Sequence, residues 1–501
     1  MAHIVVLQPM RSIEKCEEIV YKLVQLVQDE CTSITLATIL REIQQSVNSS
    51  RASAEERLER LSSWINGIET KDTYETALRY RHEGTCEWVL ELEALQSWRS
   101  AGPTRARLLW IHGPAGFGKT FMSAWIIHNL KGQIDGPLSF HFCVADNQQT
   151  RDPYAILRSW LMQILKQNED VHPVMYSTFT NRDKEKTLTQ IGLWELFVAV
   201  GEAVPGCTFV VDGFDECTNI NSGMRYHQND PRGYFLRDLM EHLPKTKSRV
   251  LVVSRDVTDI REYLHKDSTS ATGVDMFEHR VTARDTTPDV QSFSECIVNQ
   301  KLSKKAENLR RTIAAEASKR SAGMFLWIKL LEKEISPGQN AKQLSATVQK
   351  MPSGIGDAYS REIQRIAKLP REHRLQAVTI LRWILFAIRP LRVKELAEAL
   401  AVSSDELEQY PEDDMPDAWQ DGFVDENYVK ENILEKCGSL LQLRSKNPNA
   451  PIAEHTIQFV HFSAKEYLMN MPDIDPNNDA GDLRLTNRSA QDMWISKVCH
   501  Q

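Results

Sequence analysis

Short runs of apolar residues alternate with stretches of helical apolar spacing through the middle of the chain. Four runs have the length of buried strands: residues 108–111, 138–144, 207–211 and 249–253. The intervening stretches place apolar residues on one helical face: residues 121–130, 153–166 and 193–203. Alternation of this kind specifies a parallel sheet with helices on both faces. We therefore predict an α/β, doubly wound domain with a mainly parallel sheet.

The pattern changes on both sides of this domain. Towards the N-terminus, apolar residues recur at helical spacing, which predicts a small bundle or an arm packed on the next domain. After the α/β region the strand signal fades into helices, and short strands flanked by helices return near the end, which favours a winged-helix-like lobe. The predicted division is a helical region at 1–75, the α/β domain at 76–282, a helical domain at 283–370, a winged-helix-like domain at 371–471 and a poorly ordered polar tail at 472–501.

A glycine-rich motif lies between the first predicted strand and its helix. It reads Gly113, Pro114, Ala115, Gly116, Phe117, Gly118, Lys119 and Thr120, which satisfies G-x-x-x-x-G-K-[ST]. Glycines let such a loop point backbone N–H groups at an anion, and the helix adds the positive end of its dipole. Lys119 would reach the β- and γ-phosphates, and the Thr120 hydroxyl would bind Mg²⁺. The motif predicts a nucleotide site; the alternative is a structural glycine turn without a ligand.

Carboxylates follow the third predicted strand. The strand ends near Asp212, and Asp215 and Glu216 come one turn later. Because ligands lie at the carboxyl ends of the strands in an open parallel sheet, Asp212 would lie beside the glycine-rich loop as a ligand of Mg²⁺. Asp215 or Glu216 would orient an attacking water or take its proton. The alternative is a solvated acidic turn.

Two further segments are candidates for the same site. Arg255 follows the fourth predicted strand and would sense or neutralise a γ-phosphate, whereas the alternative is a simple pair with Asp256. Gly84 and Thr85 form a tight turn before a predicted helix, about 25 residues ahead of the loop. This turn would either fold back over a base or only begin the helix.

Composition argues against several other classes of protein. The formal net charge is −8 and no stripe of Lys and Arg is present, which argues against nucleic-acid binding. The nine cysteines lack the CxxC or Cys/His spacing of zinc sites. There is no signal peptide, and no apolar run approaches the roughly 20 residues of a membrane span. We therefore expect a cytoplasmic protein without a membrane span.

With these motifs assembled, the sequence resembles the NACHT-type STAND NTPases of filamentous fungi, P-loop NTPases related to the animal NOD-like receptors that include heterokaryon-incompatibility proteins. The resemblance spans roughly residues 75–470. It rests on the order and spacing of seven motifs: residues 84–88, 113–120, 212–217, 254–255, 323–327, 389–391 and 460–468. Only the 113–120 motif is specific by itself.

The resemblance implies a nucleotide-gated signalling switch, in which ADP holds a closed form and exchange for ATP opens it for oligomerisation. By position, the family's phosphate, metal, acidic and sensor residues correspond to Lys119, Thr120, Asp212, Asp215, Glu216 and Arg255. His461 resembles the winged-helix histidine that touches the β-phosphate in animal relatives; a core or surface histidine is the alternative. A histidine on a separate lobe that reached one phosphate would couple lobe position to nucleotide state.

Family members usually continue into ankyrin, WD40 or TPR repeats, and these repeats are absent after the winged-helix motif. A truncated gene model and a short form without a sensor both remain open. We expect a slow ATPase switch that binds ATP or ADP with Mg²⁺, self-associates and acts on an unidentified protein partner, in fungal innate immunity or incompatibility. The alternatives are a non-hydrolysing, nucleotide-bound scaffold and a remodelling-type ATPase, which would need a basic groove or pore loops.

Overall fold

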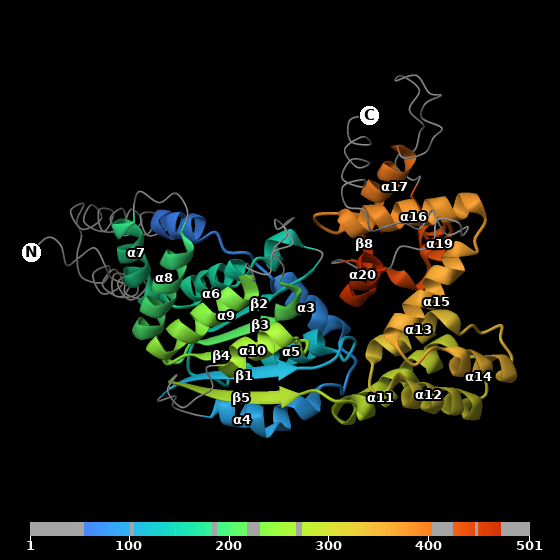
Figure 1. Ribbon diagram of the computed structural model, residues 1–501, viewed down its shortest axis with the longest axis horizontal. Coiled ribbons are helices and arrows are strands. Elements are labelled where there is room, and N and C mark those ends of the chain that lie inside the picture. The colour runs from blue at the N-terminus through green and yellow to red at the C-terminus, as the bar shows by residue number, and fades with distance from the viewer. Residues whose placement is uncertain are drawn as a thin grey trace, which may run out of the picture.

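The computed structural model describes residues 55–100, 105–145, 147–182, 188–217, 231–266, 273–402, 424–445 and 449–471. The helices expected before residue 55, most of the acidic stretch at 405–426 and the tail expected at 472–501 lie outside the described residues. Figure 1 shows an α/β layer in blue and green beside a helical part in yellow, orange and red.

A five-stranded parallel sheet forms the centre of the α/β part. The strand order is β2-β3-β4-β1-β5, and every pair within it is parallel. The strands are β1 (Ala106–His112), β2 (Leu138–Phe142), β3 (Thr208–Asp212), β4 (Arg249–Ser254) and β5 (Val274–Arg280). The predicted doubly wound α/β class is confirmed. The sequence did not single out β5, because this edge strand carries polar and charged residues over most of its length.

Helices pack on both faces of the sheet because side chains alternate along each strand. In β1, Leu108 and Trp110 pack with the layer that contains α6, α8, α9 and α10. Leu109 and Ile111 face the opposite layer, which contains α3, α4 and α5. From β1 the chain crosses to β2 at one edge of the sheet. The connections to β3, β4 and β5 then run in the opposite direction, towards the other edge. Right-handed crossovers then place their helices on opposite faces.

The described α-helices, in chain order, are α3 (Lys71–Tyr80), α4 (Glu93–Arg99), α5 (Lys119–Leu130), α6 (Pro153–Gln167), α7 (His172–Asn181), α8 (Gln190–Ala203), α9 (Pro231–His242), α10 (Thr258–Lys266), α11 (Ala283–Lys301), α12 (Glu307–Ser321), α13 (Phe325–Glu334), α14 (Ala341–Lys350), α15 (Ile355–Ala367), α16 (Arg371–Phe386), α17 (Val393–Val402), α18 (Glu426–Tyr428), α19 (Glu435–Cys437) and α20 (Phe462–Met469). Residues 55–65 are also helical, and Leu61, Trp64 and Ile65 are buried in the α6–α8 layer.

The second half is a continuous helical core that ends in a small antiparallel sheet. Residues from α11 through α20 share one hydrophobic cluster. The sheet has the order β6-β8-β7, with β6 (Leu391–Arg392), β7 (Leu441–Arg444) and β8 (Thr456–Phe459). Helix α20 follows β8 directly and packs on α15. This combination of helices and a short sheet is the winged-helix-like arrangement expected from the sequence.

Two predicted helices have different limits in the structure. The helix expected at 322–331 begins only at Phe325, because Ala322 and Gly323 have φ values of 48° and 85°. Gly323 lies so close to α11 that an added Cβ would be 2.6 Å from the Thr286 hydroxyl. The helix expected at 89–98 is two segments, η2 (Glu87–Glu91) and α4, separated by extended Leu92. None of the described helices combines the length and the apolar character needed to cross a membrane.

Candidate functional site

The loop between β1 and α5 has the backbone of a phosphate cradle. Gly116 and Gly118 have φ values of 80° and 78°, which other residues rarely adopt. Lys119 is the first residue of α5, and its ammonium donates to the carbonyl oxygens of Gly113 at 2.9 Å and Pro114 at 2.8 Å. Burial lowers the pKa of Lys119, and the negative charges of Asp215 and Asp212 oppose this effect. The Lys119 ammonium therefore lies inside the loop, close to the acidic strand end.

Asp212, the last residue of β3, joins this acidic strand end to α5. The Thr120 hydroxyl donates to one carboxylate oxygen of Asp212 at 2.8 Å, and the Ser123 hydroxyl donates to the other at 2.6 Å. Burial raises the pKa of Asp212 to about 6, although both hydrogen bonds favour the ionised form. The sequence did not single out Ser123. Its position three residues after Thr120, on the same face of α5, is the signal that was available.

The Thr120 and Asp212 oxygens fit a magnesium ion by their chemistry, because Mg²⁺ binds hard oxygen ligands and keeps several waters. Within the described part of the chain, no cluster of three or more His, Cys, Asp and Glu side chains forms a metal site made of protein ligands alone. A magnesium ion at this place would therefore need phosphate and water oxygens in addition to Thr120 and Asp212.

The two acidic residues that follow β3 have different partners. Asp215 is buried and accepts from the backbone N–H of Arg255 at 2.8 Å and from its Nε at 2.5 Å. Glu216 accepts from the backbone N–H of Ala145 at 2.8 Å. Burial, followed by the charge of Asp215, raises the pKa of Glu216 to about 8. The arrangement leaves Asp215 bound to a cation, and it makes Glu216 a stronger base than an ordinary carboxylate once Glu216 is ionised, above about pH 8.

Arg255 joins the α/β domain to the winged-helix-like lobe. Its Nη1 and Nη2 donate to the two carboxylate oxygens of Glu466 at 2.6 and 2.8 Å. The pair with Asp256 that sequence left open is not formed, since Asp256 accepts from Arg261 at 2.9 Å instead. Glu466 was missed, because nothing in the sequence distinguishes this half-buried glutamate on α20 from the other acidic residues of the chain.

His461 lies at the start of α20 and serves as its N-cap. Its Nδ1 accepts from the backbone N–H of Ser463 at 3.1 Å. Burial, followed by the positive charges of Lys119 and Arg255, lowers the pKa of His461 to about 4. The imidazole is therefore neutral at pH 7 and lies near the cations of the loop. A helix-capping role and a position beside the cradle coexist in this residue.

The Gly84–Thr85 turn is held against α11. The Thr85 hydroxyl donates to the carbonyl oxygen of His82 at 2.6 Å, so it is already used within the turn. Asp289 on α11 accepts from the backbone N–H of Cys86 at 2.7 Å and from the Trp88 indole at 3.1 Å. The following segment η2 shares a core with α5. The sequence did not single out Asp289, which ties this turn to the helical domain.

The tip of the loop contacts the helical part of the molecule. The carbonyl oxygen of Gly116 accepts from the backbone N–H of Leu326 at 3.3 Å. An added Cβ at Gly116 would be 2.8 Å from the Leu326 Cβ, and one at Gly118 would be 3.3 Å from the Phe325 ring. The segment 323–327, which contributed to the family resemblance, therefore packs directly on the glycine-rich loop.

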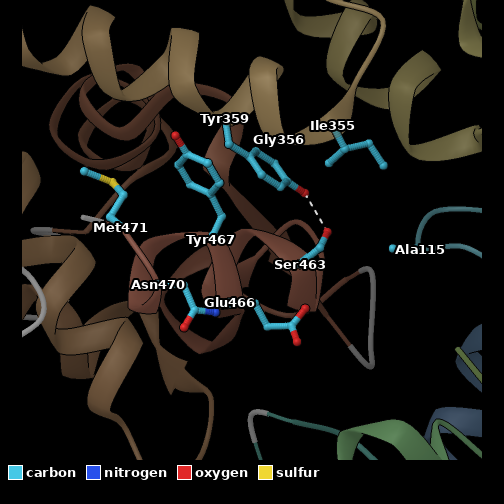
Figure 2. A pocket seen from close by; sticks show the side chains of 9 residues that line it. All are labelled: Ala115, Ile355, Gly356, Tyr359, Ser463, Glu466, Tyr467, Asn470 and Met471. Carbon is cyan, nitrogen blue, oxygen red and sulfur yellow. Dashed lines mark hydrogen bonds between the residues drawn. The ribbon is translucent and has the colours of Figure 1, made fainter. Parts of the chain in front are cut away.

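A cavity of about 380 Å³ opens beside this contact. Figure 2 shows Ala115 at one side of it, and residues of α15, α20 and the two positions that follow α20 line the rest. The Tyr359 hydroxyl on α15 lies 3.0 Å from the Ser463 hydroxyl on α20, which links these two helices. Glu466 lines the same cavity. The loop thus contacts α13 and α15, and it shares this cavity with α15 and α20.

Replacing Gly116 by alanine is expected to reduce the free energy of unfolding by about 2 to 3 kcal/mol, because a left-handed alanine is strained and its Cβ would collide with Leu326. Gly132 supplies the matched control: it has a φ of 78° and nothing within 4 Å of an added Cβ. Gly132→Ala should cost only about 1 kcal/mol. Urea unfolding of both variants measures the difference, and equal losses would contradict the close packing at Gly116.

Two family models and one curated protein match this chain. Residues 84–255 match the family model described as "Nephrocystin 3, N-terminal", and residues 365–479 match "GPI inositol-deacylase, winged helix domain". The chain is also similar to the vegetative incompatibility protein HET-E-1 of Podospora anserina, with 26% identity over 405 residues. The predicted resemblance to the fungal NACHT-type STAND NTPases is confirmed. The match includes 78% of this chain but only 26% of HET-E-1, so the chain spans about a quarter of that protein's length.

Solved structures align with this chain at low similarity. The Aeropyrum pernix ORC1 protein, solved in complex with DNA, is 14% identical, with 78% of this chain and 90% of that chain aligned and a TM-score of 0.31. Cdc6p of Pyrobaculum aerophilum is 11% identical, with 80% and 97% aligned and a TM-score of 0.30. The fold assignment therefore rests on the strand order and layers described above.

Proposed function

We propose that this NACHT-type chain is a nucleotide-gated switch that binds ATP or ADP with Mg²⁺, hydrolyses the triphosphate slowly and self-associates when the triphosphate is bound. The observation that carries the proposal is the contact of the 113–120 loop with α13 and α15, beside a cavity that the loop shares with α15 and α20. A ligand bound to this loop would therefore lie beside the helical part and the winged-helix-like lobe, whose positions would change. Such contacts are what a ligand needs to shift a conformational equilibrium.

The chemistry of each residue in and around the loop suits it to a different role in nucleotide binding and hydrolysis. Backbone N–H groups of 113–120 and Lys119 bind the phosphates, and Thr120 with Asp212 holds the magnesium ion. Bound magnesium neutralises part of the phosphate charge. Glu216 accepts the proton of the attacking water. Gly84 and Thr85 lie beside the base, and Arg255 and His461 lie beside the terminal phosphates; these roles complete the proposed site.

Nucleotide state would control self-association through the winged-helix-like lobe. His461 and Glu466 lie at the first and second turns of α20, next to cations that bind phosphate. A third phosphate would add negative charge beside these cations, and it would compete with Glu466 for Arg255. The released surface would bind further copies of the chain or a protein signalling partner, in a pathway of fungal incompatibility or immunity.

Two measurements on the purified full chain test the proposal. The nucleotide that co-purifies is identified by denaturation and ion-pair chromatography, and we expect ADP. Molar mass by light scattering is then measured with Mg–ADP and with Mg and a non-hydrolysable ATP analogue. We expect a monomer in ADP and a larger species with the analogue.

Other outcomes separate the alternatives. The absence of any bound nucleotide at millimolar concentration would refute the proposed site. Nucleotide binding with one unchanging mass would favour the non-hydrolysing scaffold. Turnover that rises on addition of nucleic acid would favour a remodelling-type ATPase and contradict a signalling switch.

A further inference from the structure

We propose that Glu466 makes the closed arrangement selective for a nucleoside diphosphate, because its carboxylate occupies the face of Arg255 that a third phosphate would use. This inference rests on the proposed nucleotide site and assigns its discrimination between ADP and ATP to one residue. A triphosphate would bind fully only when Glu466 leaves Arg255, and this step would displace α20.

The first support is the saturation of the Arg255 guanidinium. Nε donates to Asp215, and Nη1 and Nη2 donate to Glu466 in a bidentate pair. All three guanidinium nitrogens are engaged. The Phe462 ring also lies 5.6 Å from the guanidinium carbon. Paired, planar donors of this kind suit carboxylate and phosphate groups equally in shape. Glu466 therefore presents to Arg255 the same two-oxygen edge that a phosphate would present.

The second support is the closeness of Arg255 to the phosphate-binding lysine. The charge of Arg255 contributes to lowering the pKa of Lys119, and both cations lower the pKa of His461. A third phosphate bound through Lys119 thus lies in the field of Arg255. The negative charges of that phosphate and of Glu466 would repel each other at this short range. Arg255 therefore cannot bind the third phosphate and the Glu466 carboxylate together without a large electrostatic free-energy cost.

The third support is the place of Glu466 in the fold. Its helix α20 is joined to α15 through the hydroxyl contact between Ser463 and Tyr359, and the Tyr359 and Tyr467 rings lie 5.7 Å apart. These contacts fix α20 to the rest of the winged-helix-like lobe, so a displacement of Glu466 would be transmitted to that lobe. Glu466 also lines the cavity in Figure 2, which leaves open space beside its carboxylate. Glu466 could therefore leave Arg255 by moving into the cavity, and this movement would displace α20, which carries it.

The test uses Glu466→Gln, which removes the charge and keeps the shape. Binding of Mg–ADP and of Mg with a non-hydrolysable ATP analogue is measured by calorimetry on the full chain. In the wild type we expect the diphosphate to bind more tightly. In Glu466→Gln we expect the affinity ratio to move towards the triphosphate by about tenfold, as expected for loss of one charge-assisted pair.

The matched control is Glu454→Gln in the same lobe. Glu454 also accepts from two cations, Arg392 at 2.9 Å and Lys394 at 2.5 Å, far along the chain from the loop. This variant should leave the ratio unchanged. A second variant, Glu466→Asp, keeps the charge but loses reach, and should move the ratio in the same direction by a smaller factor. In an Arg255→Ala background, Glu466→Gln should have no further effect on the ratio.

The outcomes distinguish the inference from the proposed function. If wild-type protein binds both nucleotides but neither Glu466 variant changes their ratio, the inference is overturned and the nucleotide site stands. If wild-type protein binds neither, the proposed function itself fails. A ratio that shifts as much in Arg255→Ala/Glu466→Gln relative to Arg255→Ala as in the single variant would also overturn the role given to the Arg255–Glu466 pair.

Discussion

Replacing Lys119 by alanine is expected to weaken binding of ADP and ATP by at least about thirtyfold. This lysine is the cation that lies inside the glycine-rich loop, held by the carbonyl oxygens of Gly113 and Pro114. Loss of one partner of a largely buried charge pair costs about 2 to 5 kcal/mol, which corresponds to a factor of roughly thirty to several thousand. Calorimetry with Mg–ADP measures the loss, and the molar mass should no longer depend on the nucleotide added.

A lysine at the other end of the same helix provides the control. Lys131 follows α5 directly, and its ammonium lies 4.0 Å from the Tyr74 ring centroid at the opposite edge of the sheet. Lys131→Ala should therefore lower stability slightly and leave nucleotide affinity unchanged. Retention of wild-type affinity in Lys119→Ala would remove the basis for the nucleotide site. Equal losses in both variants would point to damage to α5 rather than to loss of a phosphate contact.

Replacing Glu216 by glutamine is expected to slow ATP hydrolysis by at least about tenfold while ATP still binds. A glutamine amide can keep the hydrogen bond from Ala145 but cannot take a proton from water. Steady-state phosphate release measures the rate, and calorimetry with a non-hydrolysable analogue measures binding. Glu202→Gln, an exposed change at the end of α8 and at the other edge of the sheet, should leave both unchanged.

The pH dependence of hydrolysis is a second test of Glu216 as the base. Burial raises the pKa of Glu216 to about 8, so at pH 7 the carboxyl is mostly protonated and cannot act as a base. Hydrolysis should therefore rise by about tenfold between pH 7 and pH 9 as Glu216 ionises, and then level off. The rise should disappear in Glu216→Gln. Full-rate hydrolysis by this variant, or an unchanged pH profile, would reject Glu216 as the base.

The local pattern of the chain accounts for most of the α/β half. Four of the five strands of the described sheet were visible as short apolar runs, because a strand covered on both faces must be apolar along its length. The glycine-rich loop was visible because its chemistry needs fixed residue types at fixed spacing. Only β5 escaped, since an edge strand with exposed charges lacks this signature.

The rule for parallel sheets also predicted a pairing between distant residues. Strands β1 and β3 are both parallel to β4, which separates them, so their carboxyl ends must meet at one edge. The structure places the Thr120 hydroxyl and the Asp212 carboxylate 2.8 Å apart across this edge. Ser123, which holds the other oxygen of Asp212, depends on the rotation of α5 over the sheet, and that angle is set by packing.

By itself, the sequence determined the class of sheet, the phosphate-type loop and the acidic strand end, because each follows from residue types that are close in the chain or from a general rule of topology. Tertiary structure alone decided which partner Arg255 takes. Sequence proximity offered Asp256, but the packing of α20 on α15 brings Glu466 to both Nη atoms, 211 residues away. Contacts between lobes depend on the rigid-body position of whole helices, and no local spacing encodes that position.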